Sequence, residues 1–319
     1  MIQPESICPE DPGRVNIRNA FRFLLPAFAA AAVFLLFPEN SAEGVRAGLS
    51  LCAYAVIPAL FPFTVLTPML CHAAEALFRG QERAQTAALV LSFAVGMLTG
   101  FPIGAMTVCG FYRRGILSRE QAERAVGIAN GTGPAFLVGY VGKTLCGSAA
   151  VGWCLVLAQL IASLAAALLF LRGTHTGIGV LSPVPAGSSA QTFPAFTDAV
   201  REGVGKLLTV CGFVVFFSAL RGLAARGAAA LGLPRAVTAF LCGLLEMTGG
   251  LADLAAALPD TPALRLPLSA FLIGSGGFCV FLQTAAVVRE AGISMRYYVW
   301  EKLVCGLLCA SLAAVFCCL

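Results

Sequence analysis

Charge is what this sequence has least of. Of its 319 residues only 12% are Asp, Glu, Lys or Arg, whereas an ordinary soluble domain carries about 25%. The net charge of +5 comes from arginines scattered among short polar stretches, so there is no basic tract of the kind that binds nucleic acid. The scarcity of charge therefore excludes a typical soluble domain and predicts no nucleic-acid partner.

The motifs of soluble enzymes are also missing. The sequence contains no GxSxG, no HExxH, no P-loop and no GxGxxG, so we expect no enzymatic activity and no ATP hydrolysis by this chain. The chain has two histidines, and its 13 cysteines form no CxxC pair. Most of the cysteines lie inside apolar runs, where cysteine packs as a small hydrophobic residue. We therefore expect neither a metal nor a cofactor.

Hydrophobic sequence fills the chain instead. It is 59% hydrophobic, with a mean hydropathy of +0.87. About 20 apolar residues are needed to cross a bilayer, and windows without charge follow one another along the whole chain: 23–38, 47–74, 84–112, 125–142, 144–171, 207–220, 266–288 and 303–319. The sequence predicts an all-α polytopic membrane protein embedded in a lipid bilayer.

A stretch rich in Gly, Pro, Ser and Thr divides the chain near its middle. Arginines precede the first apolar run and place the N-terminus in the cytoplasm. No small-residue cleavage site is evident after that run, so we interpret it as a retained span. The predicted organisation is an N-terminal cytoplasmic segment, a first membrane half, a linker and a second membrane half, at 1–22, 23–172, 173–197 and 198–319.

The two halves share a weak internal similarity. An alignment of 91–116 with 268–293, without gaps, matches Leu91/Leu268, Ser92/Ser269, Gly100/Gly277, Phe101/Phe278, Thr107/Thr284, Gly115/Gly292 and Ile116/Ile293. Transporters are often built from inverted repeats, and segments interrupted by Gly or Pro in both halves point to their binding site. We therefore expect two related halves, an inverted repeat, with discontinuous or re-entrant helices.

Four apolar segments contain residues that interrupt a helix: GFPIG at 100–104, ANGTGPAF at 129–136, LLEMTGGL at 244–251 and IGSGGF at 273–278. Proline removes a backbone donor, and glycine permits unusual dihedrals. In a bilayer such a break persists only where it is buried in protein or lines a wet cavity. The first break alone is equally well explained by a kinked helix that packs through small residues. Four breaks distributed over both halves favour a central binding site.

The predicted site takes its chemistry from helix ends, because a half-helix N-terminus offers free N–H groups and partial positive charge to a carboxylate or phosphate. Glu246 is interpreted as a coupling or gating group, or else as the partner of Arg235 or Arg265. Gln283 is interpreted as an amide donor or as an interhelical hydrogen bond. The predicted substrate-binding residues are Gly100, Pro102, Gly104, Asn130, Gly131, Thr132, Gly133, Pro134, Glu246, Thr248, Ser275, Gly276, Gly277 and Gln283.

The order of these motifs resembles a known family. Six motifs, taken together and in this order, resemble the sporulation integral membrane proteins of YlbJ (SpoVV) type. They are GFPIGA at 100–105, RRGILSREQAERA at 113–125, ANGTGPAFLVGYVG at 129–142, GFVVFFSAL at 212–220, LLEMTGG at 244–250 and IGSGGFCVFLQ at 273–283. That family is grouped with proteins that carry a nucleoside recognition, or gate, domain. Its elements fall here on Gly100, Phe101, Pro102, Gly104 and Ala105, on Asn130, Gly133 and Pro134, and on Glu246 and Thr248. The chain departs from the family's pattern near Ala129 or Gly131, at Lys143 and at Gly249.

The resemblance implies a transporter for a small organic anion, dipicolinate (pyridine-2,6-dicarboxylate), during endospore formation. It implies a location in the mother-cell-derived membrane around the forespore, with a homo-oligomer or other sporulation membrane proteins as further partners. Two rivals stay open: a gate-domain transporter of a nucleoside or another metabolite, and a structural or signalling membrane protein of sporulation. An enzyme that acts on lipid is a more distant alternative.

Overall fold

A computed structural model describes residues 17–78, 83–172 and 196–318 of the chain. Most of the predicted N-terminal segment and nearly all of the predicted linker lie outside these residues. The described elements are α1 (Ile17–Leu36), α2 (Pro38–Leu51), the π-helix η1 (Cys52–Val56), α3 (Ile57–Phe78), α4 (Ala84–Thr99), α5 (Ile103–Arg113), α6 (Arg119–Ala129), the π-helix η2 (Ala135–Leu145), α7 (Ala149–Phe170), α8 (Phe196–Ala230), α9 (Arg235–Leu245), α10 (Met247–Ala257), α11 (Pro262–Ser275), α12 (Gly277–Glu290) and α13 (Tyr298–Cys318).

Helices account for the regular structure throughout the described residues, and no strand occurs among them. Within that part of the chain five helical stretches are long and apolar enough to cross a membrane: Pro38–Ala74, Ala149–Phe170, Phe196–Ala230, Pro262–Glu290 and Tyr298–Cys317. The predicted fold class, an all-α polytopic membrane protein, is confirmed. The inverted relation between the halves stays a prediction.

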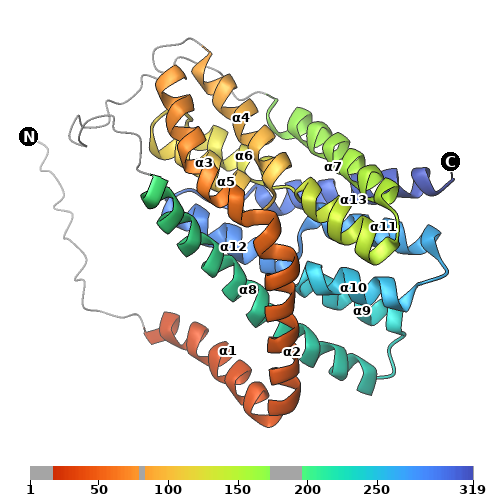
Figure 1. Cartoon of the computed structure of the whole chain (residues 1–319). Coiled ribbons are helices and arrows are strands. Elements are labelled where there is room, and N and C mark those ends of the chain that lie inside the picture. The colour runs from red at the N-terminus through yellow and green to blue at the C-terminus, as the bar shows by residue number, and fades with distance from the viewer. Residues whose placement is uncertain (1–16, 79–82, 173–195, 319) are drawn as a thin grey trace, which may run out of the picture.

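Helices from the two predicted halves pack on one another (Figure 1). The long helix α8 packs along α2 and α3, and α13 packs on both α11 and α7. The contact between α2 and α8 is close enough to need glycine, because a Cβ atom at Gly44 would lie 2.6 Å from the Cα of Ala219. Small residues permit this approach between membrane helices, where apolar burial alone gives little specificity.

All four predicted breaks are present. Each break separates two helices. The breaks lie at 100–102 between α4 and α5, at 130–134 between α6 and η2, at 246 between α9 and α10, and at 276 between α11 and α12. Glycine makes two of them possible, since Gly100 has a φ of 95° and Gly276 a φ of 80°. Side chains other than glycine rarely adopt such dihedrals. The 84–112 window is therefore two short helices rather than one span.

Two of the interrupted segments share local geometry at the predicted offset. Gly115 and Gly292 have φ values of 74° and 72°, and each N–H donates to the carbonyl three residues earlier. The hydroxyls of Thr107 and Thr284 each donate to the carbonyl four residues earlier, at 2.9 and 2.8 Å. The α4–α5 and α11–α12 segments thus end in the same way and carry the same back-bonded threonine.

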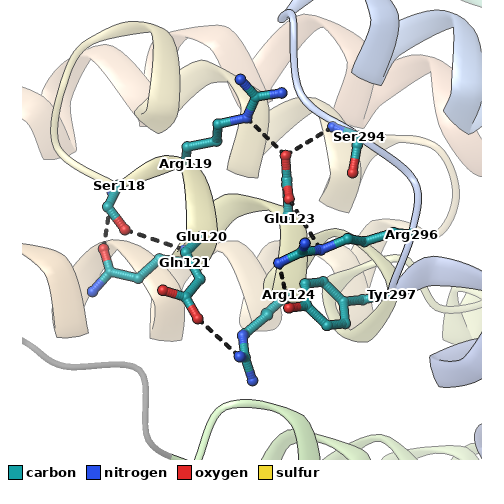
Figure 2. Close-up of polar contacts among 9 residues, drawn as sticks. All are labelled: Ser118, Arg119, Glu120, Gln121, Glu123, Arg124, Ser294, Arg296 and Tyr297. Carbon is teal, nitrogen blue, oxygen red and sulfur yellow. Dashed lines mark hydrogen bonds and ion pairs between the residues drawn. The ribbon is translucent and has the colours of Figure 1, made fainter.

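The polar connection after α5 leads into the short helix α6. Ser118 and Gln121 make a capping box at the start of α6: the N–H of Gln121 donates to Ser118 Oγ at 3.2 Å, and the N–H of Ser118 donates to Gln121 Oε1 at 2.9 Å. Figure 2 shows this cap beside the arginines of the same helix.

Candidate functional site

A cavity with about 600 Å³ of empty space, including space open to the outside of the molecule, lies where the broken helices meet. Its wall comes from both halves of the chain and includes residues of the first, second and third breaks. The lining residues are Ala55, Val56, Ala59, Leu60, Thr99, Gly100, Phe101, Thr132, Gly133, Ala135, Phe136, Val210, Val214, Glu246, Met247, Thr248, Cys279, Val280 and Gln283.

Three helix N-termini contribute to this wall. η2 begins at Ala135, α10 at Met247 and α12 at Gly277, and the wall includes residues from the first turn of each. No side chain caps the start of η2 or of α12. Because the first N–H groups of a helix lack intrahelical partners, these ends direct partial positive charge toward the cavity.

The third N-terminus is already occupied by the chain's own carboxylate. Glu246 caps α10, since its two oxygens accept hydrogen bonds from the N–H groups of Thr248 and Gly249, both at 2.7 Å. The guanidinium of Arg221 lies 3.9 Å from the Glu246 carboxylate and also pairs with Asp253. Glu246 is 2% exposed. The acid is therefore held in one position by backbone and by a neighbouring cation.

The partner of Glu246 differs from the one that the sequence suggested. We considered Arg235 or Arg265 as its ion-pair partner, but the nearest guanidinium belongs to Arg221, on α8. α8 runs for 35 residues, so Arg221 lies well inside the helix rather than at the end of a short span. The approach of the arginine is tight, because a Cβ at Gly249 would lie 2.6 Å from its guanidinium carbon.

The electrostatics of the wall also differ from the expected cationic pocket. Among the described residues that line the cavity, none is a lysine or arginine, and Glu246 is the acid. Positive potential reaches the cavity from backbone N–H groups, and the Glu246 carboxylate neutralises part of it. Much of the remaining wall is apolar, with the rings of Phe101 and Phe136 among its members. The site offers a hydrophobic surface together with a few backbone and hydroxyl donors.

The structure brings six of the predicted site residues to the cavity wall, and eight lie elsewhere. Those in the wall are Gly100, Thr132, Gly133, Glu246, Thr248 and Gln283. Those outside the lining set are Pro102, Gly104, Asn130, Gly131, Pro134, Ser275, Gly276 and Gly277. The second group includes residues that shape the breaks, so their contribution is to the backbone path.

Asn130 shows this supporting role most clearly. It is fully buried, and its side-chain amide donates to Thr284 Oγ1 at 2.8 Å and to Tyr298 Oη at 3.1 Å. Two residues later, Thr132 Oγ1 donates to the carbonyl of Ile273 at 3.2 Å. Side-chain hydrogen bonds thus hold the second break, at 130–134, against both α12 and α11.

Another polar group of the wall, Gln283, reaches the cavity from α12. Its Nε2 lies 3.2 Å from Cys279 Sγ, one turn earlier on the same helix. Thiols are weak hydrogen-bond acceptors, so this amide keeps donor capacity for another group. Both interpretations of Gln283 stay open, because the residue lines the cavity without a strong interhelical bond.

Several residues of the site region escaped the sequence analysis. Phe136 and Cys279 line the cavity, but nothing in an apolar run distinguishes a lining residue from its neighbours. Glu301 and Lys302, at the start of α13, are 0% and 6% exposed. We treated them as flanking residues just outside the 303–319 window. Their position next to an apolar run could have indicated a functional role, because an acid and a base are costly to bury in a membrane.

Comparison with known proteins agrees with the fold class. The chain is 25% identical over 338 residues to the sporulation integral membrane protein YlbJ of Bacillus subtilis (strain 168), and the match covers 93% of this chain and 83% of that protein. No family model matches the sequence, and no solved structure matches it significantly. The chain is an integral membrane protein that is similar, over most of its length, to a membrane protein named for sporulation.

Proposed function

We propose that this protein is a membrane transporter for a small organic anion, and that the anion is dipicolinate during endospore formation. One observation carries the proposal: a cavity of about 600 Å³ lies at the junction of the broken helices, with three helix N-termini in its wall. Discontinuous helices that present N-termini to an anionic substrate are a recurrent design in transporters. The proposal assigns no enzymatic step, cofactor or nucleic-acid partner to the chain.

The wall chemistry suits an aromatic dicarboxylate. The rings of Phe101 and Phe136 supply apolar surface for a planar ring, and the uncapped start of α12, together with the Ala135 N–H at the start of η2, supplies N–H donors for carboxylates. The next two N–H groups of η2 already donate to the Gly133 carbonyl. Gln283 and Thr132 add side-chain groups at the same wall. Glu246 already holds the third N-terminus, so an anion would engage the other two.

The direct test is uptake of labelled dipicolinate by proteoliposomes that contain the purified protein. We expect saturable uptake by the wild type and a loss of at least tenfold for Ala59→Phe, which places a ring in the cavity. Ala53→Phe is the matched control, because Ala53 lies outside the wall and is exposed. Absence of saturable uptake by well-folded wild type, or equal loss in both variants, would contradict the proposal.

A second candidate rests on the wall's single acid. Because the lining residues include Glu246 and no lysine or arginine, a neutral ligand such as a nucleoside also fits the cavity. Competition separates the two ligand classes. If an excess of nucleoside abolishes dipicolinate uptake, or is itself taken up faster, the ligand is the neutral one. If only dicarboxylates compete, the anion is supported.

The proposed location is the mother-cell-derived membrane around the forespore. A fluorescent fusion in a sporulating host tests it, since the signal should surround the forespore. A structural or signalling role would give the same localisation, but Ala59→Phe would then leave spore properties unchanged.

A further inference from the structure

A buried acid–base pair lies beside the cavity but outside its wall. Glu301 and Lys302 are adjacent in the first turn of α13, at 0% and 6% exposure. The Gly127 N–H and the charges of Lys302 and Arg124 act on the Glu301 carboxylate, but neither of its oxygens accepts a hydrogen bond of normal geometry from the described residues. A buried carboxylate without a well-formed hydrogen bond is costly, and ionisable groups inside a membrane protein are functional candidates by default.

The carboxylate is held in place by close packing. Its Oε2 lies against Gly127 of α6, where an added Cβ atom would be only 2.0 Å away. Two helix termini meet there, because α6 ends at Ala129 and α13 begins at Tyr298. The N-terminus of α13 favours a negative charge on Glu301, whereas burial disfavours it.

The charged and titratable groups around Glu301 come from two helices. α7 and α11 also pack on α13, but α7 has no Asp, Glu, Lys or Arg, and the basic residue of α11 bonds the Pro259 carbonyl instead. The neighbours are Arg124 from α6 and Tyr298, Lys302 and Cys305 from α13. Arg124 pairs with Glu120 on the exposed face of α6 (Figure 2). Arg124 is thus a polar side chain between the surface and Glu301.

Lys302 connects this carboxyl group to the cavity. Its ammonium donates a hydrogen bond to the carbonyl of Asn130, the first residue of the second break. It also lies 5.7 Å from the centre of the Phe101 ring, and Phe101 lines the cavity. The charge on Lys302 therefore lies next to a residue of the cavity wall.

We propose that Glu301 is a proton-binding site that couples proton entry to anion binding in the cavity. Its carboxylate accepts one proton from water, forming a neutral carboxylic acid, and later returns that proton to water. While Glu301 is charged it offsets Lys302. Once it is neutral, the positive charge of Lys302 is no longer offset and favours an anion in the cavity that Phe101 lines. The inference rests on the proposed anion transport, and it assigns to Glu301 the coupling role that the sequence suggested for Glu246.

A proton fits this position better than a metal ion. Among the described residues no three His, Cys, Asp or Glu side chains gather to form a metal site. The charged neighbours of the Glu301 carboxylate are Lys302 and Arg124, and these two cations repel a metal ion but permit protonation of the acid. Glu246 is the less suitable proton carrier, because two backbone N–H groups and Arg221 hold its carboxylate.

The test is accumulation of labelled dipicolinate in proteoliposomes under an imposed pH gradient. One coupled proton adds about tenfold to the accumulation ratio per pH unit. We expect this dependence in the wild type and in Glu202→Gln, an exposed control. In Glu301→Gln any residual uptake should not respond to the gradient, and Glu301→Asp should restore part of the response.

Several outcomes would overturn the inference. Saturable wild-type uptake with no response to the gradient would refute coupling while leaving anion transport intact, and so would a full response in Glu301→Gln. If the wild type takes up no anion, the proposed function fails, and an infrared titration of the purified protein decides the proton site. That measurement should show a buried carboxylic-acid band that Glu301→Gln lacks. An unchanged band in this variant would reject the site.

Discussion

The side-chain amide of Asn130 donates a 2.8 Å hydrogen bond to the hydroxyl of Thr284, although 154 residues separate them in the sequence. Asn130 belongs to the break between α6 and η2, and Thr284 lies on α12, just beyond the break at Gly276. This contact joins interrupted segments from the two halves of the chain. The position of the cavity wall therefore depends on buried polar bonds between the halves as well as on apolar packing.

Removing that contact should loosen the site. In Asn130→Ala the hydroxyls of Thr284 and Tyr298 lose a buried partner, which costs about 1–3 kcal/mol. We expect a lower thermal midpoint in detergent and weaker dipicolinate uptake. Thr209→Val is the control, because the Thr209 hydroxyl is exposed and bonds only within its own helix. An Asn130 variant with wild-type stability and uptake would contradict this supporting role.

Glycine at the helix crossings should be irreplaceable. A Cβ atom at Gly104 would lie 1.8 Å from the carbonyl oxygen of Ala129, a backbone atom that cannot rotate away. We expect Gly104→Ala to express poorly or to aggregate during size-exclusion chromatography. A Cβ at Gly205 meets nothing within 4 Å, so Gly205→Ala should behave as the wild type. A well-folded Gly104→Ala protein would show that α4, α5 and α6 do not pack as described.

The carboxylate cap of α10 should contribute to stability. Glu246→Gln keeps the size of the side chain but replaces one carboxylate oxygen with an NH₂ group, which cannot accept a hydrogen bond. One of the two hydrogen bonds from the N–H groups of Thr248 and Gly249 is therefore lost. We expect a loss of about 1–3 kcal/mol. Differential scanning fluorimetry in detergent measures the effect. Glu43→Gln, at an exposed position, should change the midpoint little; an equal shift in both would argue against the cap.

The interactions of Glu123 on α6 with Arg119, Ser294 and Arg296 predict that the stability of the protein depends on pH. Partial burial raises the pKa of Glu123, but the hydrogen bonds from Arg119 and from the Ser294 N–H, with Arg296 nearby, outweigh it and hold the pKa below its ordinary value of 4.5. The folded state therefore binds this proton less readily than the unfolded state. The stabilisation is complete above pH 4.5 and is lost as the pH falls through the lowered pKa.

Comparison with Glu123→Gln isolates this contribution. At about pH 7 the wild type should have the higher thermal midpoint, and the difference should shrink toward zero as the pH falls below 4.5. Glu120→Gln on the same helix removes an exposed pair with Arg124, worth about 0–1 kcal/mol. A difference between wild type and Glu123→Gln that grows at low pH would reverse the predicted sign.

The sequence was most informative where backbone chemistry decides local structure. Gly100 and Gly276 adopt left-handed dihedrals, and the capping box at Ser118 forms, because glycine, proline and capping residues act within a few positions of themselves. The breaks could therefore be located without knowledge of the packing. The same is true of the fold class, which follows from scarce charge and long apolar windows.

The sequence was least informative about partners that are distant in the chain. The approach of Arg221 to Glu246 depends on how α8 packs on α9, and the placement of Asn130 away from the wall depends on α12 and α13. The rule of charge-free windows also misplaced Glu301, because it treats any charged residue as the end of a span. Three-dimensional packing, which one sequence does not specify, decides these features.

Equilibrium binding of labelled dipicolinate to the purified protein in lipid nanodiscs tests the central claim most directly. The account predicts saturable binding that is lost in Ala59→Phe, inside the cavity, and retained in Ala53→Phe, outside it. Binding that is absent in the folded wild type, or that survives unchanged when the cavity is filled, would contradict the claim that the broken helices form an anion site.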